Sequence, residues 1–115
     1  MHVTRINQAL PYEAPGHQGM HMRRIQGREA GPADTVWMGV SIIEPGGGTT
    51  ATASAVEKFY LVLDGELEVT AELGDAKETA VLARHDSCRI APGESRQLHN
   101  RSALPCAVLL VMPNA

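Results

Sequence analysis

Short runs in which apolar and polar residues alternate dominate this chain. The clearest run covers residues 66–73, where four apolar side chains alternate with four polar ones, three of them glutamates. A period of two sends successive side chains to opposite faces of a strand, so this segment is predicted to have one buried and one solvated face. No segment longer than about eight residues has the 3.6-residue period of a helix. The pattern therefore predicts an all-β protein.

Glycine- and proline-containing turns separate this run from other strand-like segments. The predicted strands cover residues 2–6 (a short edge strand), 17–25, 35–43, 57–63, 66–73, 77–83, 87–90, 96–100 and 106–112. Short strands with turn signals every eight to twelve residues are typical of a β-sandwich or a β-barrel.

Two glycine-containing turns frame the segment 57–63. The pair Asp64-Gly65 is a strong signal for a two-residue hairpin, so residues 57–63 and 66–73 are predicted to pair. The glycines at 46–48 follow a strand, but neither a helix pattern nor the lysine–serine/threonine pair of a phosphate-binding loop comes after them. A tight turn that ends the strand 35–43 is therefore expected there.

The length and charge of the chain narrow the classes of function. A chain of 115 residues with 43% hydrophobic content is expected to form one domain with its own core. The net charge of -3 provides no basic stripe for a phosphate backbone, so nucleic acid is not an expected partner. The N-terminal residues lack the apolar stretch of a signal peptide, and the apolar run 107–112 is too short to cross a membrane. The expected location is the cytoplasm.

The histidines do not form an obvious ligand cluster. His17 and His21 are four residues apart on a predicted strand, which separates them by about 13 Å and prevents them from sharing one metal ion. A surface or dimer-edge role is expected for both. His85 is expected in a turn and His99 on an outward-facing position; a proton-shuttle role for either is the alternative.

The two cysteines, Cys88 and Cys106, lack the spacing of a metal site. We expect them to be buried thiols in neighbouring strands, because free cysteine is often buried. A disulfide or a nucleophilic thiol is the alternative.

Residues 46–65 resemble the first sequence motif of the cupin family, a family of small jelly-roll barrels. That motif runs glycine, five residues, His-x-His, three or four residues, glutamate, six residues, glycine. Here the corresponding positions hold Gly46, Thr52 and Ser54, Lys58, and Gly65.

Residues 85–100 resemble the second motif of the same family. It runs glycine, five residues, Pro-x-Gly, two residues, histidine, three residues, asparagine. Here the corresponding positions hold His85, Pro92 and Gly93, Arg96, and Asn100.

The resemblance implies a double-stranded β-helix, or jelly-roll barrel. It covers roughly residues 35–112, which are expected to form the barrel of a single domain spanning residues 1–115, with residues 1–34 as an N-terminal arm and edge strands. Barrels of this family commonly pair through an N-terminal strand, so a homodimer is expected, with residues 1–25 as the pairing arm.

The resemblance also bears on the metal. The family's metal is held by the motif histidines and glutamate, and those positions hold Thr52, Ser54, Lys58 and Arg96. Transition metals need imidazole, carboxylate or thiolate lone pairs, whereas ammonium and guanidinium groups only donate. We therefore expect no metal, no other cofactor and no metal-dependent dioxygenase activity.

A pocket follows if the family's alternation of inward and outward residues holds. Lys58 and Tyr60 would then be catalytic candidates, and the substrate-binding candidates would be Thr52, Ser54, Arg96 and Leu98. Either Trp37 or Met38 is expected to join them.

Lys58 and Arg96 dominate the predicted chemistry. Two cations about 5 Å apart repel by roughly 3 kcal/mol at an effective dielectric of ~20, so they need compensation. A bound carboxylate clamped by Arg96 would make the barrel a site for a small anionic metabolite. A lysine held neutral would give metal-independent lyase, isomerase or cyclase chemistry, with Tyr60 as proton partner.

The remaining alternative is a barrel without chemistry. It could be a ligand-binding or sensory module, or a structural protein in which acids pair with the two cations. Candidate acids are Glu57, Asp86 and Glu94. Whether the protein is an enzyme stays open at this point.

Overall fold

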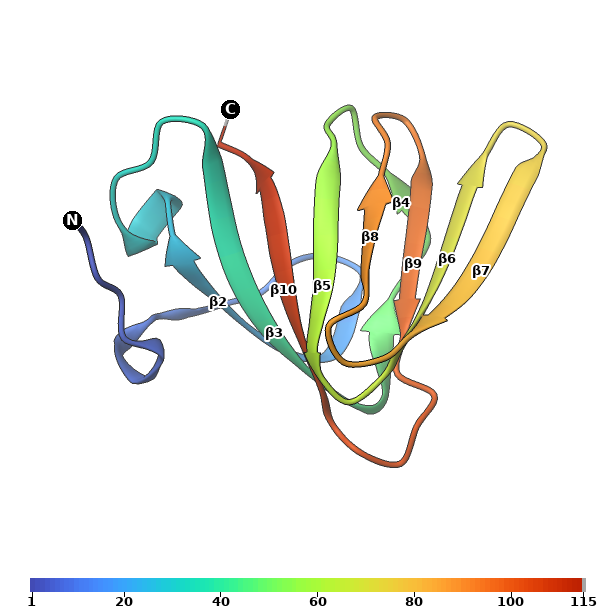
Figure 1. Ribbon diagram of the computed structural model, residues 1–115, viewed down its shortest axis with the longest axis horizontal. Helices are drawn as coiled ribbons and strands as arrows, with labels where there is room; N and C mark the ends of the chain where they lie inside the picture. The colour runs from blue at the N-terminus through green and yellow to red at the C-terminus, as the bar shows by residue number, and fades with distance from the viewer. Residues whose placement is uncertain (115) are drawn as a thin grey trace.

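The fold is built almost entirely from β-strands, as the computed structural model of residues 1–114 shows, and the prediction of an all-β class is confirmed (Figure 1). The elements are η1 (Ile6–Gln8), β1 (Pro11–Tyr12), β2 (His17–Gln26), η2 (Arg28–Ala30), β3 (Val36–Thr49), β4 (Thr52–Ala53), β5 (Lys58–Asp64), β6 (Leu67–Leu73), β7 (Ala76–Leu82), β8 (Ser87–Ile90), β9 (Ser95–His99) and β10 (Cys106–Pro113).

The strands form one antiparallel sheet that curls into a nearly closed barrel. Its order is β7-β6-β9-β3-β10-β5-β8, while β2 also pairs with β3, β1 pairs with β2, and β4 pairs with β9. Apart from the hairpin of β6 and β7, strands that are neighbours in this order are not consecutive in the sequence; in Figure 1, for example, the red β10 lies between β3 and the light-green β5. This is the connectivity of a jelly roll.

The Asp64-Gly65 turn does not make the predicted hairpin. β5 pairs with β10 and β8, whereas β6 pairs with β7 and β9, so the prediction that these two segments pair is wrong. Gly65 has φ +80°, and a Cβ atom there would lie 2.7 Å from the carbonyl oxygen of Pro105. The turn therefore needs glycine, but it carries the chain to another part of the sheet.

The sequence predicted that the glycines at 46–48 end the preceding strand. This prediction is wrong, because β3 continues through them to Thr49. A Cβ atom at Gly47 would lie 2.8 Å from the carbonyl oxygen of Gly19, and one at Gly48 would lie 2.1 Å from that of Leu98. Two neighbouring backbones approach β3 here, and only glycine leaves room for them. The edge strand predicted at residues 2–6 is also absent; that part of the arm ends in η1.

An irregularity in β2 changes which of its side chains face the barrel. The register with β3 shifts between Gln18 and Met20, and Gly19 between them has φ +61°. Between the residue pairs that flank the shift, β2 advances by two residues (18 to 20) and β3 by five (48 to 43), and this irregularity breaks the alternation of faces in β2. The predicted common face of His17 and His21 is therefore wrong: His21 is exposed, whereas His17 turns toward the barrel interior.

The core is one cluster of side chains from β3 and from β5 to β10. Its fully buried side chains are Ile43, Val62, Leu67, Ile90, Leu98, Cys106 and Val108. Cys88 and Cys106 are both free thiols, but their strands β8 and β10 are separated by β5 rather than adjacent. Burial raises the pKa of Cys106 to about 11, so its thiol is neutral near pH 7. Within residues 1–114, no helix has the length and apolar character that a membrane crossing requires.

Candidate functional site

A cavity of about 190 Å³ opens inside the barrel and is lined from β1, β2, β3, β5, β9 and β10; we refer to it as the barrel pocket. One part of its wall is apolar and contains Met20, Met22, Trp37, Leu98, Val108, Leu110 and Met112. The polar part contains Tyr12, His17, Arg24, Ser41, Lys58, Tyr60 and Arg96. No carboxylate is among these lining residues.

Four of the six predicted site residues line this pocket together. Lys58, Tyr60, Arg96 and Leu98 are only 5%, 3%, 6% and 2% exposed, although two of them carry charge. The alternation that predicted their inward orientation also put Phe59 outside, where it is 44% exposed. Of the two open candidates on β3, Trp37 lines the pocket and Met38 does not.

The structure does not bring Thr52 and Ser54 into the pocket lining. Thr52 is exposed on β4, and the half-buried Ser54 donates its hydroxyl to the Val56 carbonyl at 3.4 Å. A different hydroxyl contacts the arginine: Arg96 Nη1 donates to Thr49 Oγ1 at 2.7 Å. Sequence reasoning missed Thr49 because it lies beyond the glycines that were expected to end the strand.

Arg96 keeps hydrogen-bonding capacity after these contacts. Its Nη1 also donates, at 3.4 Å, to the Thr50 carbonyl, while its buried Nε has no partner within residues 1–114. A buried guanidinium with an unused donor has the chemistry of a carboxylate site, because a guanidinium can bind a carboxylate through two N–H groups.

The acids that could have paired with these cations are engaged elsewhere. Glu57 pairs with Arg89, Glu94 accepts from the Ala91 backbone at 2.9 Å, and Asp86 accepts from the Ala83 backbone at 2.9 Å. In the part of the chain that the structure describes, neither Lys58 nor Arg96 forms an ion pair.

The pocket shifts the pKa values of its own ionisable groups. Burial lowers the pKa of Lys58, and the positive charge of Arg96 lowers it further. Burial raises the pKa of Tyr60, which the nearby Arg96 partly opposes. Lys58 is therefore easier to deprotonate than a solvated lysine, and Tyr60 stays a neutral hydroxyl near pH 7.

His17 is a pocket residue that sequence reasoning placed on the surface. Its Nδ1 lies 2.8 Å from the Pro15 carbonyl oxygen. Burial lowers the pKa of His17; the contact with Pro15 opposes this shift, while the charges of Arg96 and Lys58 add to it. An isolated glycine inside a strand pattern often marks a bulge, so Gly19 was the signal that could have found it.

Arg24 closes one wall of the pocket. Its guanidinium carbon lies 3.8 Å from the centre of the Tyr12 ring and 4.7 Å from that of Trp37, and its Nη1 donates to Glu29 Oε1 at 2.9 Å. Arg24 is thus already paired and stacked, which leaves Lys58 and Arg96 as the uncompensated cations.

The side chains of the pocket do not fit a divalent metal. The ammonium and guanidinium groups of Lys58 and Arg96 offer hydrogens rather than lone pairs and bring positive charge. Within residues 1–114, no three histidine, cysteine or acidic side chains come close enough together to hold a metal ion.

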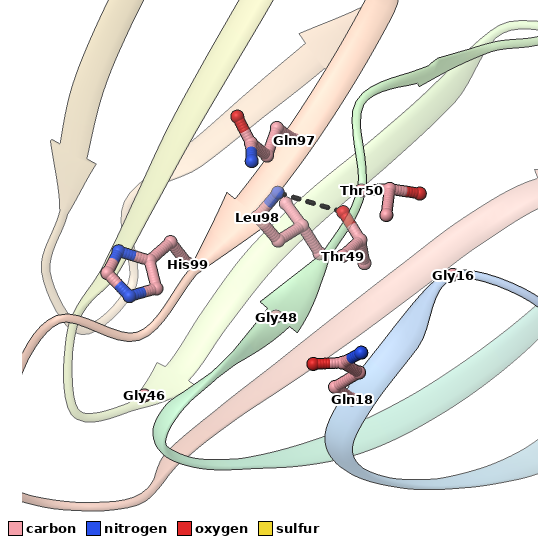
Figure 2. A pocket seen from close by; sticks show the side chains of 9 residues that line it. All are labelled: Gly16, Gln18, Gly46, Gly48, Thr49, Thr50, Gln97, Leu98 and His99. Atoms are coloured by element: carbon pink, nitrogen blue, oxygen red, sulfur yellow. Dashed lines mark hydrogen bonds between the residues drawn. The ribbon is translucent and has the colours of Figure 1, made fainter.

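A second cavity, also of about 190 Å³, lies outside the barrel; we refer to it as the outer cleft. Figure 2 shows Gly46 and Gly48 along it, with Gln18 and Thr50 on one side and Gln97 and His99 on the other. No lysine, arginine or carboxylate is among its lining residues, in contrast to the barrel pocket with its buried lysine and arginine.

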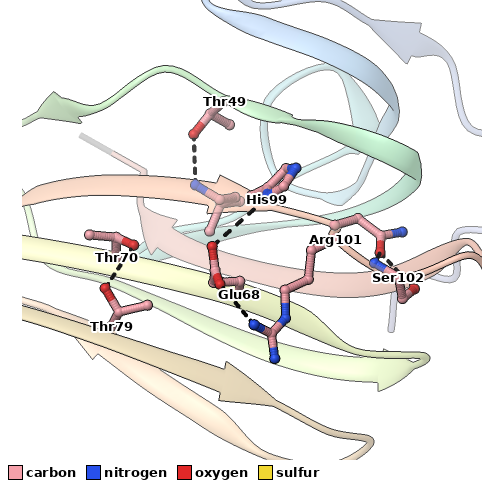
Figure 3. A network of polar contacts seen from close by, with 9 residues as sticks. Thr49, Glu68, Thr70, Thr79, His99, Arg101 and Ser102 are labelled. Atoms are coloured by element: carbon pink, nitrogen blue, oxygen red, sulfur yellow. Dashed lines mark hydrogen bonds and ion pairs between the residues drawn. The ribbon is translucent and has the colours of Figure 1, made fainter.

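A carboxylate–imidazole contact adjoins the outer cleft. Glu68 lies between His99 and Arg101, as Figure 3 shows, with Oε1 at 3.8 Å from His99 Nδ1 and Oε2 at 3.4 Å from Arg101 Nη1. His85 lines neither cavity; it occupies a turn with φ +72°, where its backbone N–H donates to the Val62 carbonyl.

The jelly-roll topology is that of a cupin-type barrel. The chain matches the cupin domain family over residues 39–112 and belongs to that family, as the two motifs indicated.

Among the proteins similar to this chain are one sequence relative and two solved structures. Over 112 residues the chain is 42% identical to a protein of Mycobacterium tuberculosis named beta-D-galactosidase Rv1717, an alignment that covers 97% of this chain and 93% of that protein. Its fold is similar to that of the polyketide cyclase RemF of Streptomyces resistomycificus, with a TM-score of 0.85 and 20% identity over 100% of this chain and 80% of that one. A predicted oxalate decarboxylase of Thermotoga maritima has a TM-score of 0.80 and 19% identity over 96% and 97% of the two chains. The structural likenesses support the fold alone.

Proposed function

We propose that the chain binds a small carboxylate-bearing molecule with an apolar body in the barrel pocket. The observation that carries this proposal is the pair Lys58 and Arg96, which are 5% and 6% exposed and have no acidic partner within residues 1–114. Buried charges are normally paired, because an isolated charge in a protein interior is strongly unfavourable. A ligand carboxylate supplies the missing negative charge, with Arg96 as its anchor and Lys58 beside it.

The volume and lining of the pocket set the class of acid. The cavity of about 190 Å³ exceeds the roughly 150 Å³ that encloses benzene in an engineered protein cavity. One ring-sized apolar body with a carboxylate is therefore a suitable ligand. Met20, Met22 and Met112 line the apolar part, and methionine adapts its shape to a bound group more easily than branched side chains do.

Lys58 extends the proposal to metal-independent turnover of an oxo acid. The lowered pKa of Lys58 increases the fraction of free amine, which adds to a ketone and loses water to form an imine. The Tyr60 hydroxyl, which stays protonated, is the proton partner for that step. An imine withdraws electrons from the neighbouring carbon, which is the activation that lyase, isomerase or cyclase chemistry requires.

Two measurements test the binding site and its lysine. Calorimetry with benzoate is expected to show saturable 1:1 binding to the purified chain, lost in Arg96→Met and kept in Arg89→Met, whose exposed arginine lies on β8. Borohydride reduction with a panel of oxo acids is expected to add the mass of the reduced imine to the wild type and not to Lys58→Met. If benzoate does not bind, the anion site is refuted; if no adduct forms across the panel, the imine is.

Galactoside hydrolysis is a second candidate, favoured by the 42% identity to a protein named beta-D-galactosidase. Glycosidases generally use two carboxylates beside the glycosidic bond, and the lining of the barrel pocket contains none. The outer cleft meets this requirement in part, since Glu68 contacts His99 at its edge. Hydrolysis of a nitrophenyl β-galactoside that is lost in Glu68→Gln but kept in Lys58→Met would assign the activity to the outer cleft.

We further propose a homodimer that pairs through the N-terminal arm. Three apolar side chains of the arm are exposed: Val3 by 53%, Ile6 by 52% and Leu10 by 64%. Contact with a second copy would remove them from water. Light scattering is expected to give twice the mass of the chain, and an Ile6→Glu, Leu10→Glu double variant is expected to give the mass of one chain; a monomeric wild type would contradict this proposal.

A further inference from the structure

We propose that His17 is the proton acceptor of the barrel pocket and removes a proton from the carbon next to the carbonyl group of a bound oxo acid. This inference rests on the proposed function, because it needs an acid held by Arg96. It goes beyond that function by assigning a base and a reaction, carbonyl enolisation, to the pocket.

The contact with Pro15 fixes which ring nitrogen of His17 can accept a proton. A carbonyl oxygen only accepts hydrogen bonds, so Nδ1, at 2.8 Å from it, must carry the hydrogen. In the neutral ring the lone pair is then on Nε2. Within residues 1–114, the ring forms no other hydrogen bond, so Nε2 is available to a ligand.

The backbone around His17 holds the ring in the pocket. Gly16, with φ +71°, precedes it, and a Cβ atom there would lie 2.4 Å from Thr50 Oγ1. Gly19, with φ +61°, lies at the register shift that turns His17 inward. These two glycines flank the histidine, so its inward position follows from the geometry of the chain.

The charged groups around the ring keep it neutral. Arg96 on β9 and Lys58 on β5 face the pocket, and Arg24 lies on the same strand as His17; the other titratable lining groups are the phenols of Tyr12 and Tyr60. No carboxylate lines the pocket to stabilise an imidazolium. Burial, Arg96 and Lys58 accordingly lower the pKa of His17, so the base form prevails near pH 7.

The proposed step balances without any oxidant or co-reactant. Nε2 takes the proton from the carbon, the electrons of the broken C–H bond form a carbon–carbon double bond, and the carbonyl π electrons move onto oxygen. The enolate oxygen accepts hydrogen bonds from the Tyr60 hydroxyl and the Lys58 ammonium. In the protonated imine of the substrate, the C=N π electrons move onto the Lys58 nitrogen instead, giving an enamine. Return of the proton to carbon regenerates the oxo acid from the enolate. From the enamine it regenerates the iminium, which water hydrolyses to the oxo acid and free Lys58.

The first test concerns the free protein. Nitrogen-detected NMR of ¹⁵N-histidine-labelled chain at pH 7, with His17 assigned by its absence in His17→Gln, is expected to show a neutral ring with hydrogen on Nδ1. A protonated ring, or hydrogen on Nε2, would overturn the inference whatever the pocket binds.

The second test measures the reaction. In D₂O, the wild type is expected to exchange the methyl hydrogens of pyruvate and the C3 hydrogens of 2-oxobutyrate faster than buffer alone, as followed by proton NMR. His17→Gln is expected to lower the enzymatic rate by about 100-fold or more, in line with the usual contribution of a general base. The rate should require a single deprotonated group with a pKa below the usual histidine value.

The controls separate this inference from the proposed function. His21→Gln changes an exposed histidine of the same strand and is expected to exchange like the wild type. Benzoate binding is expected to survive in His17→Gln within about threefold. Wild type that binds benzoate but gives no exchange, or His17→Gln that exchanges normally, refutes the role of His17 and leaves the acid site standing; failure of the wild type to bind benzoate or any oxo acid refutes both.

Discussion

Replacing Lys58 by methionine removes one of the two uncompensated cations of the barrel pocket while keeping a side chain of similar length. Lys58 is 5% exposed, so its ammonium gains little from bulk water in the folded state. The substitution also suits its surroundings, because several methionines already line the pocket. The ligand-free variant is therefore expected to be more stable than the wild type.

The size of the effect follows from electrostatics. Two unit charges about 5 Å apart repel by about 3 kcal/mol at an effective dielectric of ~20, and the opening of the pocket to solvent reduces this. We expect a gain of about 1–3 kcal/mol in the free energy of unfolding, or about 4 °C in Tm for each kcal/mol in a domain of this size. Lys77→Met, on an exposed position of β7, is the matched control and should change the stability by less than about 0.5 kcal/mol.

The pH dependence identifies the cause. The folded pKa of Lys58 is below its ordinary value of 10.5, so the charge destabilises the fold fully at pH values below the folded pKa. That penalty is relieved as the pH rises from the folded pKa toward 10.5, because the unfolded chain then binds more protons than the folded one. The stability difference between Lys58→Met and the wild type should therefore shrink over this range.

Urea unfolding followed by circular dichroism, with and without benzoate, measures both effects. Benzoate at about 100 times its Kd should stabilise the wild type by about 2.7 kcal/mol and the variant by much less. A variant less stable than the wild type without ligand would show that Lys58 is already compensated in the free protein. Equal stabilisation of both by benzoate would show that the acid does not bind beside it.

Three further substitutions test the frame of the pocket. Thr49→Ala removes the hydroxyl that accepts hydrogen bonds from Arg96 Nη1 and the Leu98 backbone N–H, at 2.7 and 3.0 Å. It should lower the free energy of unfolding in urea by about 1–3 kcal/mol and weaken benzoate binding, and Thr49→Ser should restore both. An unchanged Kd for benzoate in Thr49→Ala would show that the hydroxyl does not position Arg96. Asn100→Ala breaks four hydrogen bonds of a fully buried side chain and should lower the free energy of unfolding by about 3 kcal/mol or more. A loss below about 1 kcal/mol would mean that water replaces these hydrogen bonds. Gly48→Ala would place a Cβ atom 2.1 Å from the Leu98 carbonyl oxygen, which belongs to the backbone and cannot move aside as a side chain could. The substitution should lower Tm by at least about 8 °C. A Tm equal to that of the wild type would show that β3 and β9 separate easily.

The chain's own pattern predicted most of the fold and the centre of the site. Local alternation predicted most strand positions and the all-β class, because the face on which a side chain lies depends only on its neighbours along a regular strand. The resemblance of the two motifs to the cupin family added the jelly roll and the inward orientation of Lys58, Tyr60, Arg96 and Leu98.

Properties that depend on contacts between distant segments were not predictable in this way. Asp64-Gly65 is a genuine turn, yet β5 and β6 do not pair, because the partners of each strand come from elsewhere in the barrel. The glycines at 46–48 were expected to form a turn, whereas Gly47 and Gly48 leave room for the backbones of β2 and β9. A local signal shows that the backbone is unusual there, but it does not show what approaches it.

The same distinction applies to the residues of the pocket. The sequence, with its resemblance to the cupin family, predicted that Lys58 and Arg96 share the interior of the barrel. Only the tertiary structure decided that Thr49 holds Arg96 and that His17 enters the pocket. The physical reason lies in two irregularities that contacts with neighbouring strands specify. The shift at Gly19 changes the faces of β2, and β3 continues through its glycines as far as Thr49.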